Sequence, residues 1–143
     1  MNVSSILKVK GSSVATARPD DTLEVIAKRL AEHKIGAIVV VGEGNQVAGI
    51  VSERDIIRAL SRNSAGALSL AVREVMTKDV MTCNETSTIE QMMSVMTQGR
   101  FRHVPVVQDG TLVGIVSIGD VVKHHIAEVE MEVTAMRDYL ATG

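Results

Sequence analysis

The stretch AGIVSERD at residues 48–55 recurs as VGIVSIGD at residues 113–120. In each copy a glycine precedes a short β-branched run, which is typical of a strand. The run ends on a serine, and an aspartate follows three residues later, where an amphipathic helix is expected to begin. A serine and an aspartate at this spacing can cap the helix, and they can also bind the hydroxyl groups of a sugar.

The similarity between the two halves extends beyond this stretch, at a period of about 66 residues. A polar and small stretch at residues 63–66 indicates the break between the copies. We therefore expect one repeat over residues 1–64, a linker over residues 65–71 and a second repeat over residues 72–143. The corresponding pairs outside the opening stretch include Val14 and Val80, Thr16 and Thr82, Thr22 and Thr88, and Glu24 and Glu90.

Hydrophobic periodicity gives each repeat the order β-α-β-β-α and the chain an α/β (α+β) fold class. A short extended piece precedes a helix whose start carries a predicted capping box, Asp21 with Glu24 and Ser87 with Glu90. A buried strand follows, at residues 37–41 and 103–107, and a tight turn leads into the strand of the opening stretch.

The last helix is predicted to continue well beyond the second repeat. Its apolar residues are spaced 4, 3, 4, 3 and 4 apart, as in a coiled coil. This stripe can pack on its own domain or form the seam of a homodimer, and the spacing leaves both possibilities open. The residues are Val122, Ile126, Val129, Val133, Met136 and Leu140.

Composition argues against several classes of protein. The net charge is −2, and the chain has one Phe, one Tyr and no Trp, so neither a basic field nor stacking aromatics favour nucleic-acid binding. No apolar run is long enough to span a membrane, no signal peptide is recognisable, and the single Cys83 suits a reducing compartment. We therefore expect a cytoplasmic protein that binds neither nucleic acid nor membrane.

Catalysis is also not expected. The chain has no nucleophile–histidine–acid order, no metal-spaced cluster and no glycine-rich phosphate loop. Cys83 has no base beside it in the sequence, which argues against a catalytic thiol. Slow turnover of a bound nucleotide would favour the enzyme alternative.

The whole chain resembles a tandem pair of cystathionine-β-synthase (CBS) domains, a Bateman module, in a stand-alone protein. The resemblance depends on the repeated GIVSxxD and on PDDTL at residues 19–23, VREVMT at 72–77 and RHVPVV at 102–107. It implies two repeats packed face to face with pseudo-twofold symmetry, and two clefts that bind adenosine-containing ligands such as AMP, ADP, ATP, NAD or S-adenosylmethionine.

The resemblance also implies roles for particular residues. Asp55 and Asp120 would bind ribose, and Ser52 and Ser117 precede them by three positions. Arg102 and His103 would reach phosphate. Further nucleotide contacts are expected from Arg54, Thr16, Thr82, Val104, Ile50 and Ile115.

The first repeat has Gly36 and Ala37 where the second has the basic pair Arg102 and His103. We therefore expect the two clefts to differ, and Asp120→Ala to weaken nucleotide binding more than Asp55→Ala. Because aromatic residues are so few, aliphatic side chains at the strand ends are expected to hold the adenine.

The favoured function is a regulatory module that senses an adenine nucleotide or dinucleotide. It would need no obligatory cofactor or metal, would form a homodimer and would act in trans on an effector protein. The alternative is a constitutive homodimeric scaffold whose ligand sites are vestigial.

Overall fold

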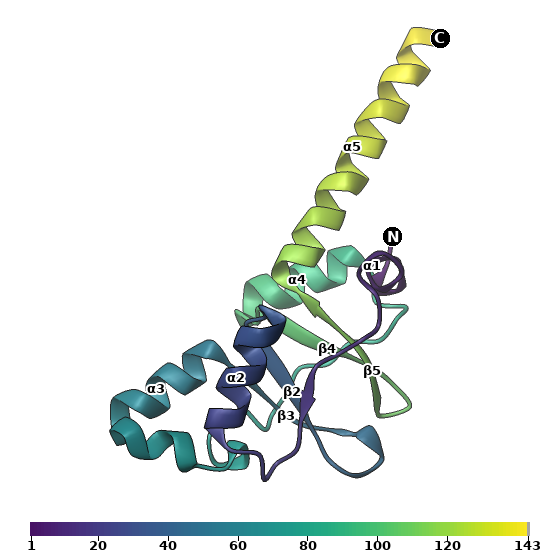
Figure 1. Cartoon of the computed structure of the whole chain (residues 1–143). Helices are drawn as coiled ribbons and strands as arrows, with labels where there is room; N and C mark the ends of the chain where they lie inside the picture. Colours follow the sequence, from purple (N-terminus) through teal and green to yellow (C-terminus); the bar gives the residue numbers. More distant parts are fainter. Residues whose placement is uncertain (143) are drawn as a thin grey trace.

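The computed structural model describes residues 1–142 and shows a mixed α/β body from which one long helix projects (Figure 1). The order of elements confirms the expected alternation, with an additional helix at the N-terminus. The helices are α1 (Val3–Lys10), α2 (Leu23–His33), α3 (Glu53–Asn63), α4 (Ile89–Gly99) and α5 (Ile118–Thr142). The strands are β1 (Thr16–Ala17), β2 (Ala37–Val41), β3 (Val47–Ser52), β4 (His103–Gln108) and β5 (Thr111–Ser117).

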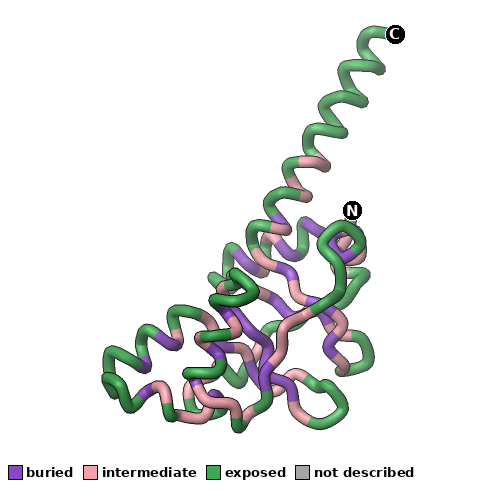
Figure 2. The backbone as a smooth tube through the Cα atoms, in the orientation of Figure 1, coloured by how far each residue is buried: buried purple, intermediate pink, exposed green. Residues whose placement is uncertain are grey.

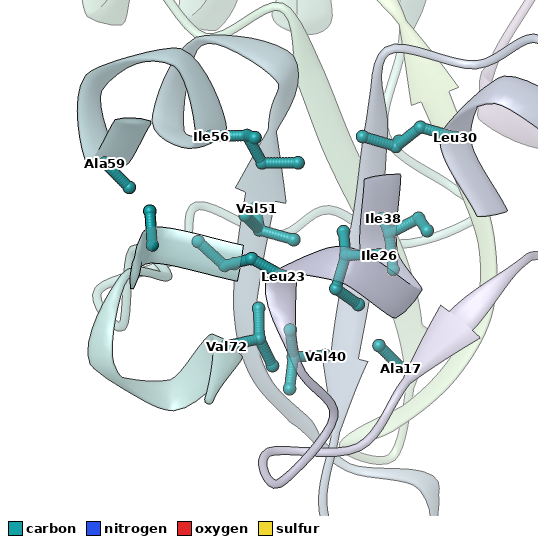
Figure 3. Packing of buried hydrophobic residues seen from close by; sticks show 11 residues of the cluster. Ala17, Leu23, Ile26, Leu30, Ile38, Val40, Val51, Ile56, Ala59 and Val72 are labelled. Atoms are coloured by element: carbon teal, nitrogen blue, oxygen red, sulfur yellow. The ribbon is translucent and has the colours of Figure 1, made fainter. Parts of the chain in front are cut away.

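The first repeat contains a three-stranded sheet in the order β1-β2-β3. Strand β1 runs parallel to β2, and β2 pairs antiparallel with β3. Helices α2 and α3 cover one face, and their apolar side chains meet those of the strands (Figure 3). Leu23, Ile26 and Ile38 are fully buried there, as the helical and strand periodicities predict.

The second repeat differs from the first at its beginning. Strands β4 and β5 form a two-stranded antiparallel sheet, and the expected first strand is reduced to a single bridge. In this bridge Cys83 N donates to Pro105 O at 3.0 Å, and Val107 N donates to Cys83 O at 2.8 Å. The turn between β4 and β5 consists of Asp109 and Gly110, both with positive φ, as a type I′ turn requires.

The two predicted capping boxes lie one residue too early in the chain. Thr22 and Thr88 are the N-caps of α2 and α4, and Thr88 forms its box with Gln91. Asp21 instead accepts a hydrogen bond from Arg29, and Ser87 donates to the side chain of Asn84. A threonine N-cap satisfies the helix equally well, and this leaves the preceding residue available for bonds outside the helix.

The N-terminal segments of the two repeats cross over. Val3, Ile6 and Leu7 of α1 pack into the hydrophobic core of the second repeat, with α4, β4 and β5. Val72, at the start of the second repeat, is fully buried in the core of the first. Each core therefore requires residues from the other half of the chain.

The sheets of the two repeats face each other. Val39, Val41 and Leu112 form a small buried cluster between them, and Asn45 donates from its side chain to Leu112 O at 3.1 Å. This contact lies where β3 and β5 begin, since Asn45 precedes β3 and Leu112 is the second residue of β5. The serine of each GIVSxxD motif is the last residue of its strand, at the opposite end from this contact.

The second half of α5 leaves the body altogether. Figure 2 shows buried residues gathered in the body and an exposed helix beyond it. Every residue from 129 to 142 is exposed. None of the helices among residues 1–142 combines the length and the hydropathy needed to cross a membrane.

Candidate functional site

Both GIVSxxD motifs form capping boxes at the starts of α3 and α5. Asp55 Oδ2 accepts from Ser52 N at 2.9 Å and from Ser52 Oγ at 3.2 Å, and Ser52 Oγ accepts from Asp55 N. Asp120 Oδ2 accepts from Ser117 N and Ser117 Oγ, both at 2.9 Å. The capping role is therefore present in both copies. It uses one carboxylate oxygen and leaves Oδ1 without a hydrogen bond from the described residues.

Asp55 and Ser52 lie on a cleft of about 340 Å³ between the two repeats, which we call the first cleft. Its charge is mostly positive, since only Glu53 accompanies Asp55 as an acidic residue. The lining residues are Gly36, Ala37, Ile50, Ser52, Glu53, Arg54, Asp55, Arg58, Thr77, Arg100, Phe101, Arg102 and His103. The arginines come from both repeats, so both must be folded for the charge to assemble.

The apolar part of the first cleft includes an aromatic ring. Phe101 lines the cleft beside Ile50 and Ala37, so the expectation of purely aliphatic walls is wrong. The ring lies against Gly99, where a Cβ atom would clash with it. Phe101, which also packs against the second core, therefore adds apolar surface to that of Ile50 for a flat base.

A short bridge forms one edge of the first cleft. Ile50 N donates to Thr77 O at 3.0 Å, and Thr77 N donates to Ile50 O at 2.9 Å. Gly49 permits this approach, because a Cβ atom there would lie 2.8 Å from Thr77 O. The loop that follows η3 (Val72–Glu74) is thereby fixed against the end of β3.

The second GIVSxxD motif lies in different surroundings. A second cleft of about 460 Å³ includes Ser117, Ile115, His103 and, from α1, Lys10. Lys10 Nζ donates to Asp120 Oδ2 at 2.7 Å and to Ile115 O at 3.0 Å. An ammonium group of the protein itself therefore holds both the aspartate and the neighbouring strand carbonyl. In the first repeat, the corresponding carbonyl of Ile50 bonds to Thr77.

The basic pair of the second repeat lies where the two clefts meet. His103 lines both clefts, and Arg102 lines the first. A Cβ atom on Gly36 would lie 3.5 Å from His103 Cε1, an ordinary contact distance, so the histidine of the second repeat lies against Gly36 of the first. Arg102 therefore lines the same cleft as Asp55, and the relative contribution of Asp55 and Asp120 to binding stays a prediction.

Two groups in this region have altered proton affinity. Burial, followed by the nearby Lys10 charge, lowers the pKa of His103 below its ordinary value. At Asp120 burial raises the pKa, but the hydrogen bonds from Lys10 and Ser117 outweigh it, and the net pKa is lowered. At neutral pH, Asp120 is therefore ionised and His103 is neutral in the ligand-free protein.

Some predicted site residues do not line either cleft. Val104 is fully buried in the second core, and Thr82 is exposed. Thr16 lies in β1, where its carbonyl accepts from Arg29. Asp120 is also absent from the lining of both clefts, although its partner Lys10 lines the second.

Several lining residues were not predicted. Arg58 follows Arg54 by one helical turn, so helical spacing from a chosen residue could have identified it. Arg100 and Phe101 directly precede the predicted pair at 102–103. Lys10 had no such signal, because only the crossing of α1 to the second repeat brings it near Asp120.

Cys83 does not have the properties of a nucleophile. Its burial raises the pKa of the thiol to about 12, so the thiolate is scarce at neutral pH. Within residues 1–142 no group of three or more His, Cys, Asp or Glu side chains is placed to hold a metal ion.

Comparison with protein families gives two matches to the CBS domain, over residues 6–62 and 72–126. Among curated proteins, the chain is 34% identical to the mitochondrial CBS domain-containing protein CBSX3 of Arabidopsis thaliana. That match covers 99% of this chain and 72% of the plant protein.

Solved structures show the same architecture. A CBS-domain containing protein from Agrobacterium tumefaciens is 46% identical, with a TM-score of 0.83 over 87% of this chain and 99% of that one. The CBS domain pair of the protein MJ0100 is 28% identical, with a TM-score of 0.79 over 90% of this chain and 98% of that one. The MJ0100 structure contains 5′-methylthioadenosine and S-adenosyl-L-methionine.

Proposed function

This chain belongs to the CBS domain family as a tandem pair, and we propose that it is a regulatory module that binds an adenosine nucleotide. The observation that carries the proposal is the first cleft, where the Asp55 carboxylate lies in a cavity lined by Arg54, Arg58, Arg100 and Arg102. The adenosyl ligands of MJ0100, a relative of the same architecture, support the class of ligand.

The first cleft offers a partner for each part of a nucleotide. Asp55 Oδ1 is available to accept from ribose hydroxyls, and its capping bonds through Oδ2 fix the orientation of the carboxylate. A charged hydrogen bond of this kind contributes about 1.5–3 kcal/mol. Arginines bind phosphate in a bidentate manner, and Phe101 with Ile50 offers apolar surface to the base.

The number of cations favours a phosphorylated ligand over a neutral nucleoside. Arg58 NH1 lies 3.7 Å from Asp55 Oδ1, and its side chain is 67% exposed. This weak pairing leaves the guanidinium able to turn toward an anion at small cost. We therefore assign AMP, ADP, ATP or a dinucleotide to the first cleft.

The second cleft is proposed as the weaker site for the same ligands. A ribose there would compete with Lys10 for Asp120, since Lys10 already donates to that carboxylate at 2.7 Å. Lys10 and Ser117 both donate to Asp120 Oδ2, so the sugar would meet Oδ1 of a carboxylate whose charge is already paired with an ammonium group. Occupancy would therefore begin at the first cleft.

The ligand would regulate an effector protein in trans, and the module would act as a homodimer. Because the arginines of the first cleft come from both repeats, a bound phosphate would favour one arrangement of the repeats. A nucleotide sensor requires such a difference in ligand affinity between two arrangements of the repeats. A scaffold with vestigial sites would lack it.

The ultraviolet spectrum of freshly purified protein tests the proposal. With one Tyr and no Trp the chain absorbs little near 280 nm, so bound adenine would dominate the spectrum near 260 nm. We expect a 260 nm absorber that is released by denaturation and passes a filter. If the protein is purified empty, AMP, ADP or ATP at 100 times Kd should stabilise it by about 2.7 kcal/mol. An empty protein that none of these ligands stabilises would favour the scaffold.

A further inference from the structure

We propose that residues 122–140 of α5 pair with the same residues of a second copy, as a parallel, in-register, two-stranded coiled coil. The inference deepens the homodimer of the proposed function by giving its surface and orientation. It does not depend on the identity of the ligand.

The face of α5 that contacts the body is separate from the apolar seam. Val121 is the buried residue of the helix and lies toward the body. Val122 is turned from it by roughly 100°, and Ile126, which is 52% exposed, follows on the same side. The seam therefore begins at the edge of the intramolecular contact, which half covers Val122 and Ile126, and the rest of it continues away from the body.

The part of the seam beyond residue 128 receives no burial from its own chain. Val129, Val133, Met136 and Leu140 are all exposed, and Leu140 is 70% exposed. A solitary helical segment of this length is marginal in water, because most helical stability comes from packing of an apolar face. The segment therefore requires a partner, and the projecting helix leaves the seam accessible (Figure 1).

The spacing assigns the seam to heptad positions. Ile126, Val133 and Leu140 are at position a, and Val122, Val129 and Met136 are at position d. Ile126 and Val133 are the β-branched a residues typical of two-stranded coiled coils, although Val122, Val129 and Met136 stand at d in place of the usual Leu. The pattern is continuous over the seam, so an identical helix complements it in register.

Flanking charges select the parallel orientation. In a parallel pair, Glu132 at position g faces Arg137 at position e of the partner, which is attractive, and symmetry provides two such contacts. In an antiparallel pair of full overlap, Glu132 would face its own copy and Lys123 would face Arg137. Like charges at these positions are unfavourable, so the sequence favours a second copy in parallel.

Charge reversal in the full chain, followed by sedimentation equilibrium, tests the orientation. Arg137→Glu and Glu132→Arg should each raise the dimer dissociation constant about tenfold, and the double variant should restore it. Asp138→Arg makes the same change of charge as Glu132→Arg at an outer position and should leave the constant unchanged. In an antiparallel pair Arg137→Glu would face Lys123 and tighten the dimer, which would overturn the proposal. A monomeric wild type, or a dimer indifferent to both reversals, would also overturn it.

A cross-link provides an independent readout. In a Cys83→Ala background, Met136→Cys should form a symmetric disulfide with its copy, because in-register d positions lie opposite each other. In the antiparallel pair the two cysteines would be about 15 Å apart, and absence of the cross-link would contradict the parallel register. Nucleotide affinity, measured on the same variants by calorimetry, should not change. Loss of dimer pairing is thus distinguishable from failure of the nucleotide proposal.

Discussion

Lys10 Nζ lies 2.7 Å from Asp120 Oδ2, although the two residues are 110 positions apart in the chain. The contact joins the last turn of the N-terminal helix to the first turn of the long C-terminal helix. It also places a cation on the aspartate that the second GIVSxxD motif would otherwise offer to a ligand.

Removing this cation should lower the stability of the protein. Lys10→Met keeps the apolar stem and deletes the charge, and we expect the free energy of unfolding to fall by about 1 kcal/mol. The estimate is modest because the two side chains are 35% and 26% exposed, and water weakens such pairs. Lys8→Met, on an exposed position of the same helix turn, is the control for urea denaturation and should have no effect.

The difference between wild type and Lys10→Met should depend on pH. Because the folded-state pKa of Asp120 is lowered, its contribution to stability is present above the ordinary aspartate pKa and is lost as pH falls through the folded value. The difference in stability between the two proteins should therefore begin to shrink as pH falls below 3.8, the ordinary aspartate value, and should vanish only below the lower folded-state pKa. A constant difference across that range would mean that Lys10 stabilises the fold by packing alone.

His103 should couple phosphate binding to proton uptake. Its pKa is lowered in the ligand-free protein, so below the ordinary histidine pKa the unfolded chain holds more protons. Stability without ligand should accordingly decline as pH falls from about 7 toward the folded pKa. A phosphate in the first cleft would favour the charged imidazole, and AMP should bind more tightly at pH 6 than at pH 7.5.

Calorimetry in buffers of different ionisation enthalpy measures this proton uptake. In His103→Gln, the only proton uptake on AMP binding should be that of the AMP phosphate itself. Adenosine has no phosphate, and its binding should cause no proton uptake in either protein. Equal proton uptake by wild type and His103→Gln would contradict a phosphate site beside His103.

Gly49 should tolerate no side chain. The Cβ atom of Gly49→Ala would lie 2.8 Å from Thr77 O, a backbone atom that is fixed by its own bridge to Ile50. We expect a loss of about 1–3 kcal/mol in unfolding experiments, as for other overpacked sites. Gly42→Ala, where no atom lies within 4 Å, is the matched control. Similar stabilities of the two variants would show that the loop at Thr77 is not fixed.

The sequence predicted the repeated architecture well because local patterns determine most of it. Alternating periods and the duplicated GIVSxxD motif identified both sheets and the helices around them. The first strand of the second repeat is only a single bridge at Cys83, because the sequence of a short extended segment does not indicate how many of its residues pair with a neighbouring strand. The capping boxes were misplaced by one residue because Asp21 and Thr22 are both good N-caps.

The clefts were harder to predict because they depend on contacts between the repeats. Asp55, Ser52 and Arg102 were candidates from their motifs, but their meeting in one cleft follows from the pseudo-twofold packing. Comparison within one repeat had paired Arg102 with Asp120 instead. The contact of Lys10 with Asp120 could not be predicted, because no local sequence pattern indicates that α1 packs on the opposite repeat.

Calorimetric titration of wild type, Asp55→Asn and Asp120→Asn with AMP, ADP and ATP tests the central claim most directly. The account predicts that at least one of these nucleotides binds the wild type, and that Asp55→Asn weakens it roughly 10- to 150-fold, which corresponds to about 1.5–3 kcal/mol. Asp120→Asn should weaken it much less, because Asp120 does not line the first cleft and its carboxylate is already paired with Lys10 through Oδ2. Circular dichroism of each variant verifies that the fold is kept. Binding that survives Asp55→Asn unchanged, or no binding of any of the three at millimolar concentration, would contradict the account.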